Sequence, residues 1–219
     1  MTATIQLTAE QIDQCISAYN DALWAGRTYS FDPVNTKFMT MEQLRKERLS
    51  ILVGELAFAM FLRRNIGIVN RYEDILDCSR IWSTLPVCAN HWTFQLKPAV
   101  AHRYMYVPWS ELIARKDSNT LPHSYVMFET EWSEEFNEPT GKVRFYGMIS
   151  LSKILHKHSE LFITRGDTPG QDALGPLPAD CYRVNKITVS EDWGHNIYHC
   201  LKKNPQDTSK YPAPYILSC

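Results

Sequence analysis

Hydrophobic residues recur every three to four positions near the start of the chain, which is the spacing of one face of an α-helix. Thr8 and Gln11 stand three residues apart just before this pattern, as in a helical capping box. Gly26 follows the last periodic residue and favours a helix end there. We therefore predict a first helix whose apolar face carries Ile12, Cys15, Ile16, Tyr19 and Leu23.

A second helical pattern follows Thr40 and Gln43, which repeat the capping-box spacing. It predicts a long helix that ends near residues 65–67. The first half of this helix is basic and amphipathic, whereas the second half, residues 51–62, is apolar on nearly all sides. Helices that are apolar all round belong in protein interiors, so we expect the second half to be buried.

Beyond Gly67 the pattern changes to that of short β-strands. Residues 92–97 alternate strictly, which places Gln95 and Lys97 on one face and apolar side chains on the other. Pro98 ends this strand or puts it at the margin of a sheet. The later pattern predicts two strands at 124–128 and 143–149 joined by a loop with Pro139 and Gly141, a short helix at 150–158, a loop at 166–180, a strand at 182–189 and a C-terminal helix at 191–203.

This order of elements predicts a mixed α/β fold, in which helices flank a central sheet. We assign residues 1–40 to an N-terminal helical extension, 41–190 to the α/β core and 191–219 to a C-terminal helix and tail. The length of 219 residues suits one large domain.

The composition narrows the function. The 23 Lys and Arg residues are balanced by 24 Asp and Glu residues, so bulk positive charge does not hold nucleic acid. Neither GxGxxG nor GxxxxGK[ST] is present, which argues against the common nucleotide-cofactor folds. The chain shows no signal-peptide pattern and no apolar run long enough to span a bilayer, so we expect a cytoplasmic protein. The six cysteines form no CxxC pair, which gives little support for structural zinc.

Several polar residues need a common explanation. Glu55 lies in the apolar half of the long predicted helix, where an ionised carboxylate is costly unless it is paired or binds a cation. Asp74 and Asp77 follow in the segment that leads into the strands. Gln95 and Lys97, at positions i and i+2 of a strand, point to the same side. The sequence thus offers acidic, amide and ammonium groups for one site.

Such a set of groups suits phosphodiester hydrolysis. Mg²⁺ prefers oxygen ligands and lowers the pKa of bound water, while a lysine orients that water or stabilises developing charge. The alternative is structural, with Glu55 paired to Arg48 two turns back and with Gln95 and Lys97 on an exposed strand face.

The motifs Gly54-Glu55-Leu56-Ala57-Phe58-Ala59 and Phe94-Gln95-Leu96-Lys97, with an acidic residue between them, resemble the PD-(D/E)xK nuclease superfamily. This superfamily includes many restriction endonucleases and nucleases of phages and mobile elements. The resemblance covers residues 41–190 and implies a restriction-endonuclease-like αβββαβ core.

The resemblance also implies roles for individual residues. Glu55, Asp77 (or Asp74) and Gln95 would hold Mg²⁺ or Mn²⁺, and Lys97 would act on the attacking water or the transition state. The chain departs from the family pattern at Gln95, where the family has a second acid. A site with an amide at this position is less negative and should hold metal more weakly.

Arginine makes bidentate contacts with phosphate, and residues 27–71 carry eight Lys and Arg against four Asp and Glu. Residues 129–138, in contrast, carry five acids and no base, so we expect this hairpin to point away from DNA. The alternative for the basic residues is an ordinary solvated helix face. Our candidates for DNA contacts are Arg45, Arg48, Arg63, Arg64 and Arg103.

These observations predict a metal-dependent endonuclease that hydrolyses DNA phosphodiester bonds. A restriction-type enzyme that cuts both strands of a symmetric site needs two active sites, so we expect a homodimer. The alternative is a nuclease fold with a decayed metal site that binds nucleic acid or protein. We expect no membrane partner and no nucleotide cofactor, and the choice between DNA and RNA stays open.

Overall fold

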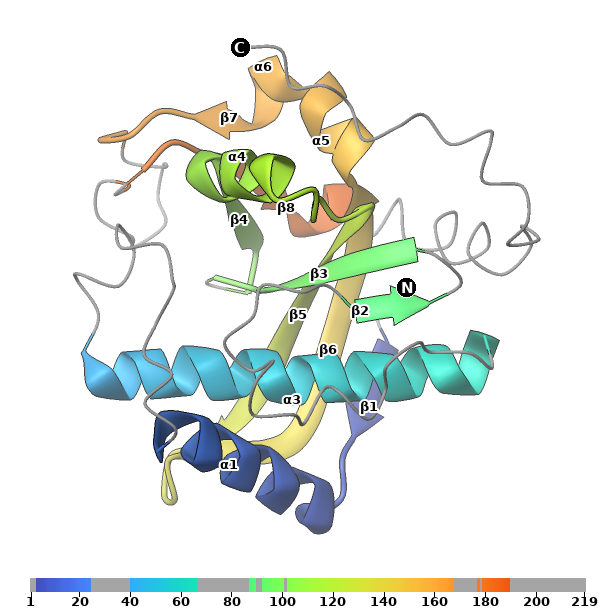
Figure 1. Ribbon diagram of the computed structural model, residues 1–219, viewed down its shortest axis with the longest axis vertical. Coiled ribbons are helices and arrows are strands. Elements are labelled where there is room, and N and C mark those ends of the chain that lie inside the picture. The colour runs from blue at the N-terminus through green and yellow to red at the C-terminus, as the bar shows by residue number, and fades with distance from the viewer. Residues whose placement is uncertain are drawn as a thin grey trace.

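The computed structural model of the protein contains two β-sheets, with helices on both faces of the larger one (Figure 1). No helix among the residues it describes is long and apolar enough to cross a membrane. The described residues are 3–24, 40–66, 87–89, 92–100, 102–167, 177 and 179–189.

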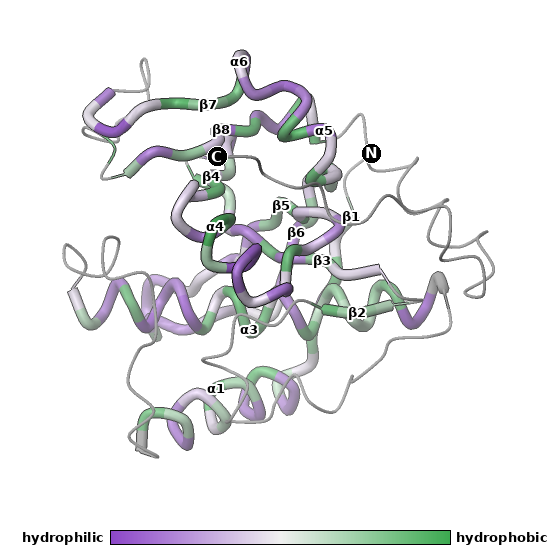
Figure 2. Tube along the Cα trace, turned by 45° about the horizontal axis from the view of Figure 1, so that its top comes forward, coloured by the Kyte–Doolittle hydropathy of each residue, from purple (hydrophilic) through white to green (hydrophobic). Residues whose placement is uncertain are grey.

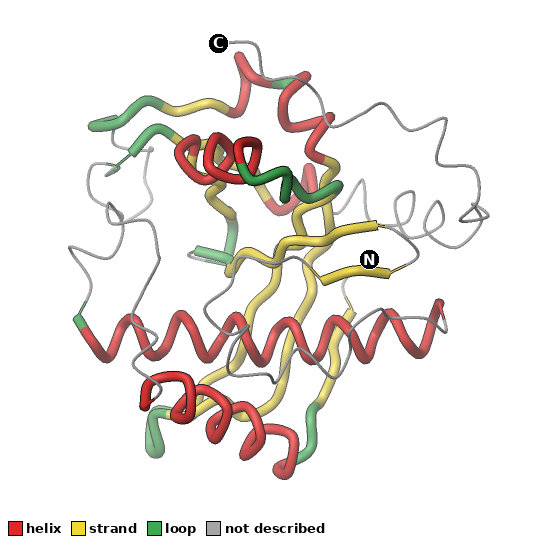
Figure 3. The backbone as a smooth tube through the Cα atoms, viewed as in Figure 1, coloured by secondary structure: helices red, strands yellow, loops and turns green. Residues whose placement is uncertain are grey.

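The larger sheet has five strands in the order β1-β6-β5-β3-β2. Neighbouring strands are antiparallel except for β3 and β5, which are parallel with Gln95 opposite Tyr125 and Lys97 opposite Met127. Figure 3 shows β5 and β6 as two long strands that cross the long helix. The strands of this sheet are β1 (Ala3–Gln6), β2 (Val87–Ala89), β3 (Trp92–Pro98), β5 (Ser124–Ser133) and β6 (Glu138–Ser150).

A second, antiparallel sheet has three strands in the order β4-β8-β7. The chain enters it directly after β3, and short helices connect it to the larger sheet. Its strands are β4 (Tyr104–Pro108), β7 (Phe162–Ile163) and β8 (Cys181–Asn185), and the short helices are α4 (Trp109–Asp117), α5 (Leu151–His156) and α6 (His158–Leu161).

Both predicted N-terminal helices are present, as α1 (Ala9–Trp24) and α3 (Met41–Ile66). Each begins with the predicted capping box. The backbone N–H of Thr8 donates to Gln11 Oε1 at 2.9 Å, and that of Thr40 donates to Gln43 Oε1 at 2.8 Å, while each threonine hydroxyl accepts from the glutamine N–H in return. Figure 2 shows hydrophobic residues concentrated in the middle of α3.

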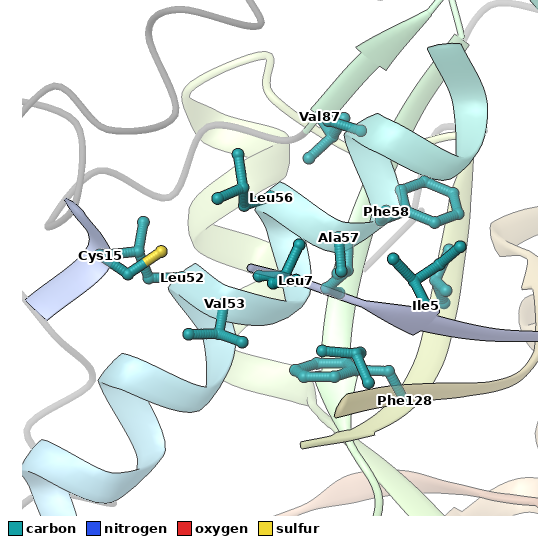
Figure 4. Close-up of a cluster of buried hydrophobic side chains, with 14 of the residues drawn as sticks. Ile5, Leu7, Cys15, Leu52, Val53, Leu56, Ala57, Phe58, Val87 and Phe128 are labelled. Carbon is teal, nitrogen blue, oxygen red and sulfur yellow. The ribbon is translucent and has the colours of Figure 1, made fainter. Parts of the chain in front are cut away.

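The middle of α3 packs on one face of the larger sheet, as its apolar sequence predicts. Phe58 and Ala57 are fully buried there, together with Ile5 and Leu7 from the N-terminal strand region and Cys15 from α1 (Figure 4). Residues 3–24 therefore share a core with the sheet: β1 pairs with β6, and α1 packs against α3.

The opposite face of the larger sheet forms a second core with α4, α5 and the smaller sheet. Tyr125 and Met127 of β5, Leu112 of α4 and Ile154 of α5 are all fully buried in it. Because side chains alternate along a strand, β5 and β6 contribute to both cores.

Several predicted boundaries are wrong. Pro139 and Gly141 lie inside β6, where a shift of register with β5 and a positive φ of 84° at Gly141 accommodate them. The strand predicted at 182–189 ends at Asn185, whose side chain accepts from Thr188 N at 2.8 Å and starts a helical turn at 186–189. The predicted helix at 150–158 is divided into α5 and α6.

The mixed α/β class predicted from the sequence is confirmed. Strands β1, β2, β4 and β7 and helix α4 were not predicted. Most of the predicted loop at 166–180 and the C-terminal helix at 191–203 lie outside the described residues. The division of the chain at residues 40 and 190 stays a prediction.

Candidate functional site

The alternation of β3 places its polar and apolar side chains on different faces of the sheet. Phe94 and Leu96 are fully buried in the core on the α3 side, with the ring centroids of Phe94 and Phe58 5.3 Å apart. Gln95 and Lys97 therefore face the other side, where α4 covers them.

Helix α4 brings an acidic and a basic residue, one turn apart, onto these two side chains. Lys97 Nζ donates to Glu111 Oε2. Arg115 Nε donates to Glu111 Oε1 at 2.9 Å, and Arg115 Nη2 donates to Gln95 Oε1 at 2.7 Å. Gln95, Lys97, Glu111 and Arg115 thus form a continuous network, which we call the β3–α4 polar cluster.

The β3–α4 polar cluster is largely withdrawn from water. Gln95 is 9% exposed and Arg115 3%, while the side chains of Lys97 and Glu111 are 17% and 16% exposed. Burial alone would raise the pKa of Glu111, but the charges of Lys97 and Arg115 and the hydrogen bonds from both outweigh it and lower that pKa below its ordinary value. Glu111 is therefore ionised at neutral pH.

Tyr125 lies next to this cluster on β5, directly across from Gln95. Its hydroxyl is fully buried and makes no hydrogen bond with the described residues. Burial and the negative charge of Glu111 raise the pKa of Tyr125 well above its ordinary value, against the effect of Arg115. The hydroxyl is thus a neutral donor at the inner side of the cluster.

The structure does not bring all the predicted site residues together. Glu55 is on α3, the helix that packs on the Phe94 face of the sheet, opposite the face of Gln95 and Lys97. Asp74 and Asp77 lie outside the described residues.

The described residues of the cluster offer too few oxygen ligands to hold a metal ion by themselves. Mg²⁺ takes several oxygen ligands, and the cluster offers the Glu111 carboxylate and the Gln95 amide oxygen, both of which already accept hydrogen bonds from Arg115. Nowhere in the described part of the chain do three or more His, Cys, Asp or Glu side chains gather as a metal site. A further carboxylate, such as Asp74 or Asp77, would have to complete the set.

The predicted DNA-contact arginines are spread over the molecule. Arg45 binds the tip of the β5–β6 hairpin, donating to Asn137 O at 2.9 Å with Glu138 Oε1 3.8 Å away. Arg63 and Arg64 are exposed at the end of α3, and Arg48 is half-buried in its first half. Arg103 is exposed in the turn that follows β3.

Glu111 and Arg115 are the site residues that sequence analysis missed. Their segment was not predicted to be helical, so their spacing of four residues was not interpreted as a helix-face ion pair. The spacing itself is a usable signal, because a glutamate four residues before an arginine is the favoured order on a helix.

A groove of about 370 Å³ opens beside the cluster, at the point where β3 ends. Pro98 and Ala99, which directly follow Lys97, line one side of it. Charged residues of α3, β5 and β6 and the indole of Trp132 line the rest.

Comparison of the chain with models of known protein families, with curated proteins and with solved structures finds no match.

Proposed function

We propose that this protein is a metal-dependent nuclease that hydrolyses DNA phosphodiester bonds at a site centred on Lys97. The observation that carries the proposal is the contact between the Lys97 ammonium and the Glu111 carboxylate, beside the Gln95 amide. Glu111, from α4, would supply the acid that the PD-(D/E)xK pattern has at the position of Gln95.

The placement of these charges supports a functional role. Removing an ion pair from water costs more than its mutual attraction usually returns, and apolar residues of similar size often stabilise a core as well or better. A lysine and an arginine that share one carboxylate on a sheet face are therefore poorly explained by stability alone. Clusters of groups with perturbed pKa values are typical of active sites.

The chain's own residues would act through charge and position. The Glu111 carboxylate would hold the Lys97 ammonium, whose side chain is 17% exposed, so that it can orient a water molecule and offset negative charge that develops on a phosphate. Arg115 fixes the Gln95 amide and the second Glu111 oxygen. A bound Mg²⁺ or Mn²⁺ would supply Lewis acidity and a more acidic water, and its remaining ligands would come from Asp74 or Asp77.

One observation favours a second candidate, a nuclease fold that binds nucleic acid without cutting it. Arg115 is almost completely buried and donates to the single side-chain oxygen of Gln95 and to one of the two carboxylate oxygens of Glu111. These are the oxygens that a metal would share. In this second case the β3–α4 polar cluster holds α4 on the sheet and does no chemistry.

Cleavage of supercoiled plasmid DNA with Mg²⁺ or Mn²⁺ tests the proposal. We expect the wild-type protein to nick the plasmid and Lys97→Met to lose activity by at least about a hundredfold. Lys157→Met is the matched control, because Lys157 is also ion-paired to a glutamate, at 3.0 Å, but lies away from the cluster. Equal cleavage by wild type and Lys97→Met would contradict the role proposed for Lys97. A folded wild-type protein that does not cleave DNA would contradict the proposed nuclease activity.

Calorimetric titration with Mn²⁺ separates the two candidates. The nuclease predicts binding that Glu111→Gln weakens and that Asp77→Ala or Asp74→Ala abolishes. The non-catalytic candidate predicts no Mn²⁺ binding at all. Sedimentation velocity of the active protein would test the homodimer expected for an enzyme that cuts both strands.

A further inference from the structure

The groove beside the β3–α4 polar cluster has the shape and charge of a ligand site. It lies where β3 ends at Pro98 while β5 and β6 continue, with β1 paired to β6 along residues 142–145. Ala99 N still donates to Phe128 O at 2.7 Å, and beyond that point β5 is paired, among the described residues, only with β6. The groove therefore begins at Pro98, directly after Lys97, and follows the edge of β5.

We propose that this groove binds a single, unpaired strand of DNA and leads it toward Lys97. The inference rests on the proposed function, which it narrows by naming an unpaired strand in place of a duplex. The groove's cations, its aromatic ring and its size each support the inference.

The cations of the groove lie at the surface, where a phosphate can compete for them with their partners in the protein. Lys46 and Arg144 are exposed, and the Lys142 side chain is 41% exposed. They come from α3 and β6 and so approach the groove from two sides. Lysine and arginine contacts to phosphates are the main source of affinity for nucleic acid.

The two acids of the groove belong to the acidic segment 129–138, which the sequence predicts to point away from DNA, but both are already paired within the protein. Glu131 accepts from Lys142 Nζ at 2.9 Å and from Thr140 Oγ1 at 2.9 Å. Glu129 accepts from the hydroxyl of Tyr146 and lies 2.5 Å from His102 Nδ1. Their repulsion of a phosphate is thereby reduced, and their free lone pairs can accept from the amino groups of bases.

Trp132 gives the groove an aromatic platform. Its ring is fixed because Nε1 donates to Ser50 Oγ at 2.8 Å and because the ring packs against the core on the α3 side. Lys46 Nζ lies 5.2 Å from the ring centroid, so a cation is already held over the indole. An unpaired base could stack on this ring if Lys46 moved aside to contact the phosphate, and such stacking is how proteins hold single strands without sequence preference.

The groove suits one strand better than two. A volume of about 370 Å³ is in the range of small-ligand sites and accommodates roughly one nucleotide of a single strand. The bases of a duplex are already stacked on both faces and cannot use Trp132. A strand whose base lies on Trp132 would place a neighbouring phosphate near Pro98, next to Lys97.

Fluorescence polarisation with labelled oligonucleotides of about 12 nucleotides tests the inference on the full chain. The assay contains EDTA, so binding is measured without cleavage. We expect the single strand to bind more tightly than the duplex, and Lys142→Gln and Arg144→Gln each to weaken single-strand binding about fivefold. Lys157→Gln is the matched control and should change the affinity by less than about twofold, because Lys157 has a similar exposure and ion pair outside the groove.

A second pair of variants tests the stacking. Trp132→Leu should weaken binding about tenfold, whereas Trp132→Phe, which keeps a ring, should bind nearly as well as the wild type. Unchanged affinity in both Lys142→Gln and Arg144→Gln, or tighter binding of the duplex, would overturn the inference. Tighter binding of RNA of the same sequence would overturn the assignment to DNA.

The outcomes also separate this inference from the nuclease itself. If single-stranded DNA is cleaved while the groove variants bind single strands as tightly as the wild type, the proposed nuclease activity is kept and the groove is rejected as the binding site. If binding depends on the groove but no DNA is cleaved, the groove is kept as the binding site and the proposed nuclease activity is rejected.

Discussion

The Glu111 carboxylate is the only anion among the four side chains of the β3–α4 polar cluster, and both of its oxygens are used. Its two partners, Lys97 and Arg115, come from different elements, so the carboxylate joins β3 to α4. Removing one partner of a buried pair leaves the other charge without compensation, which is far costlier than replacing the pair as a whole. The stability of the cluster should therefore depend most on Glu111.

We expect Glu111→Gln to lower the free energy of unfolding by about 3 kcal/mol, because two cations then lose the carboxylate that they share. Urea denaturation followed by circular dichroism measures this change. Glu160→Gln is the control, since Glu160 forms an exposed pair with Lys157 whose loss should cost less than about 1 kcal/mol. Equal effects of the two substitutions would show that the cluster is not a buried network.

The lowered pKa of Glu111 predicts a dependence of stability on pH. A folded-state pKa below the unfolded value gives stability that is complete above the unfolded value, 4.5, and is lost as the pH falls through the folded value. Between pH 7 and 5 Glu111 should therefore cause almost no change in the free energy of unfolding. Below pH 4.5 the free energy of unfolding of the wild type should fall more steeply than that of Glu111→Gln, as measured by urea titrations at each pH. Parallel curves for the two proteins would contradict this.

Part of this site could be predicted from the sequence. Strict alternation over β3 placed Gln95 and Lys97 on one face, and the structure confirms that they share a network. Their partners could not be predicted, because Glu111 stands 14 positions beyond Lys97 on a helix whose contact with β3 depends on the intervening β4. Alternation identifies the face of a strand but not what covers it.

At the scale of helices and strands, local sequence patterns predicted an element only where the capping and periodicity signals were strong. The two capping boxes and the helical spacing after them marked α1 and α3. Helix α4 has no such start, since Pro108 precedes it and no side chain caps it. Strand β1 has four residues, too few for alternation to stand out, and it exists because β6 pairs with it. Such elements are stabilised by tertiary contacts.

The helix α3 contains one position where an added methyl group would clash. A Cβ at Gly54 would lie within 2.8 Å of the Cδ2 and Cζ atoms of Phe128, whose ring is fully buried. We expect Gly54→Ala to lower the free energy of unfolding by about 2 kcal/mol, because overpacking outweighs the gain in helix propensity. Combining it with Phe128→Leu, which frees space, should cost less than the sum of the two single changes. A Gly54→Ala protein as stable as the wild type would show that α3 does not approach the sheet this closely.

At the scale of the whole molecule, the larger sheet separates two cores and is shared by both. Alternating residues of β5 enter the α3 side and the α4 side, so neither core can form without that strand. The sequence predicted a central sheet flanked by helices, but not the pairing of β1 with β6 or the separate β4-β8-β7 sheet. Such pairings depend on contacts between distant segments, which local periodicity does not encode.

The shared cores predict that the N-terminal elements unfold together with the rest of the chain. Cys15 of α1 and Cys181 of β8 report on opposite sides of the molecule. Burial raises the pKa of Cys15 to about 12 and that of Cys181 to about 11, so neither thiol reacts readily in the folded protein. Labelling with iodoacetamide across a urea series, read for each peptide by mass spectrometry, should give the same midpoint for both. Labelling of Cys15 at clearly lower urea would instead show that residues 1–40 unfold as a separate extension, as the sequence suggested.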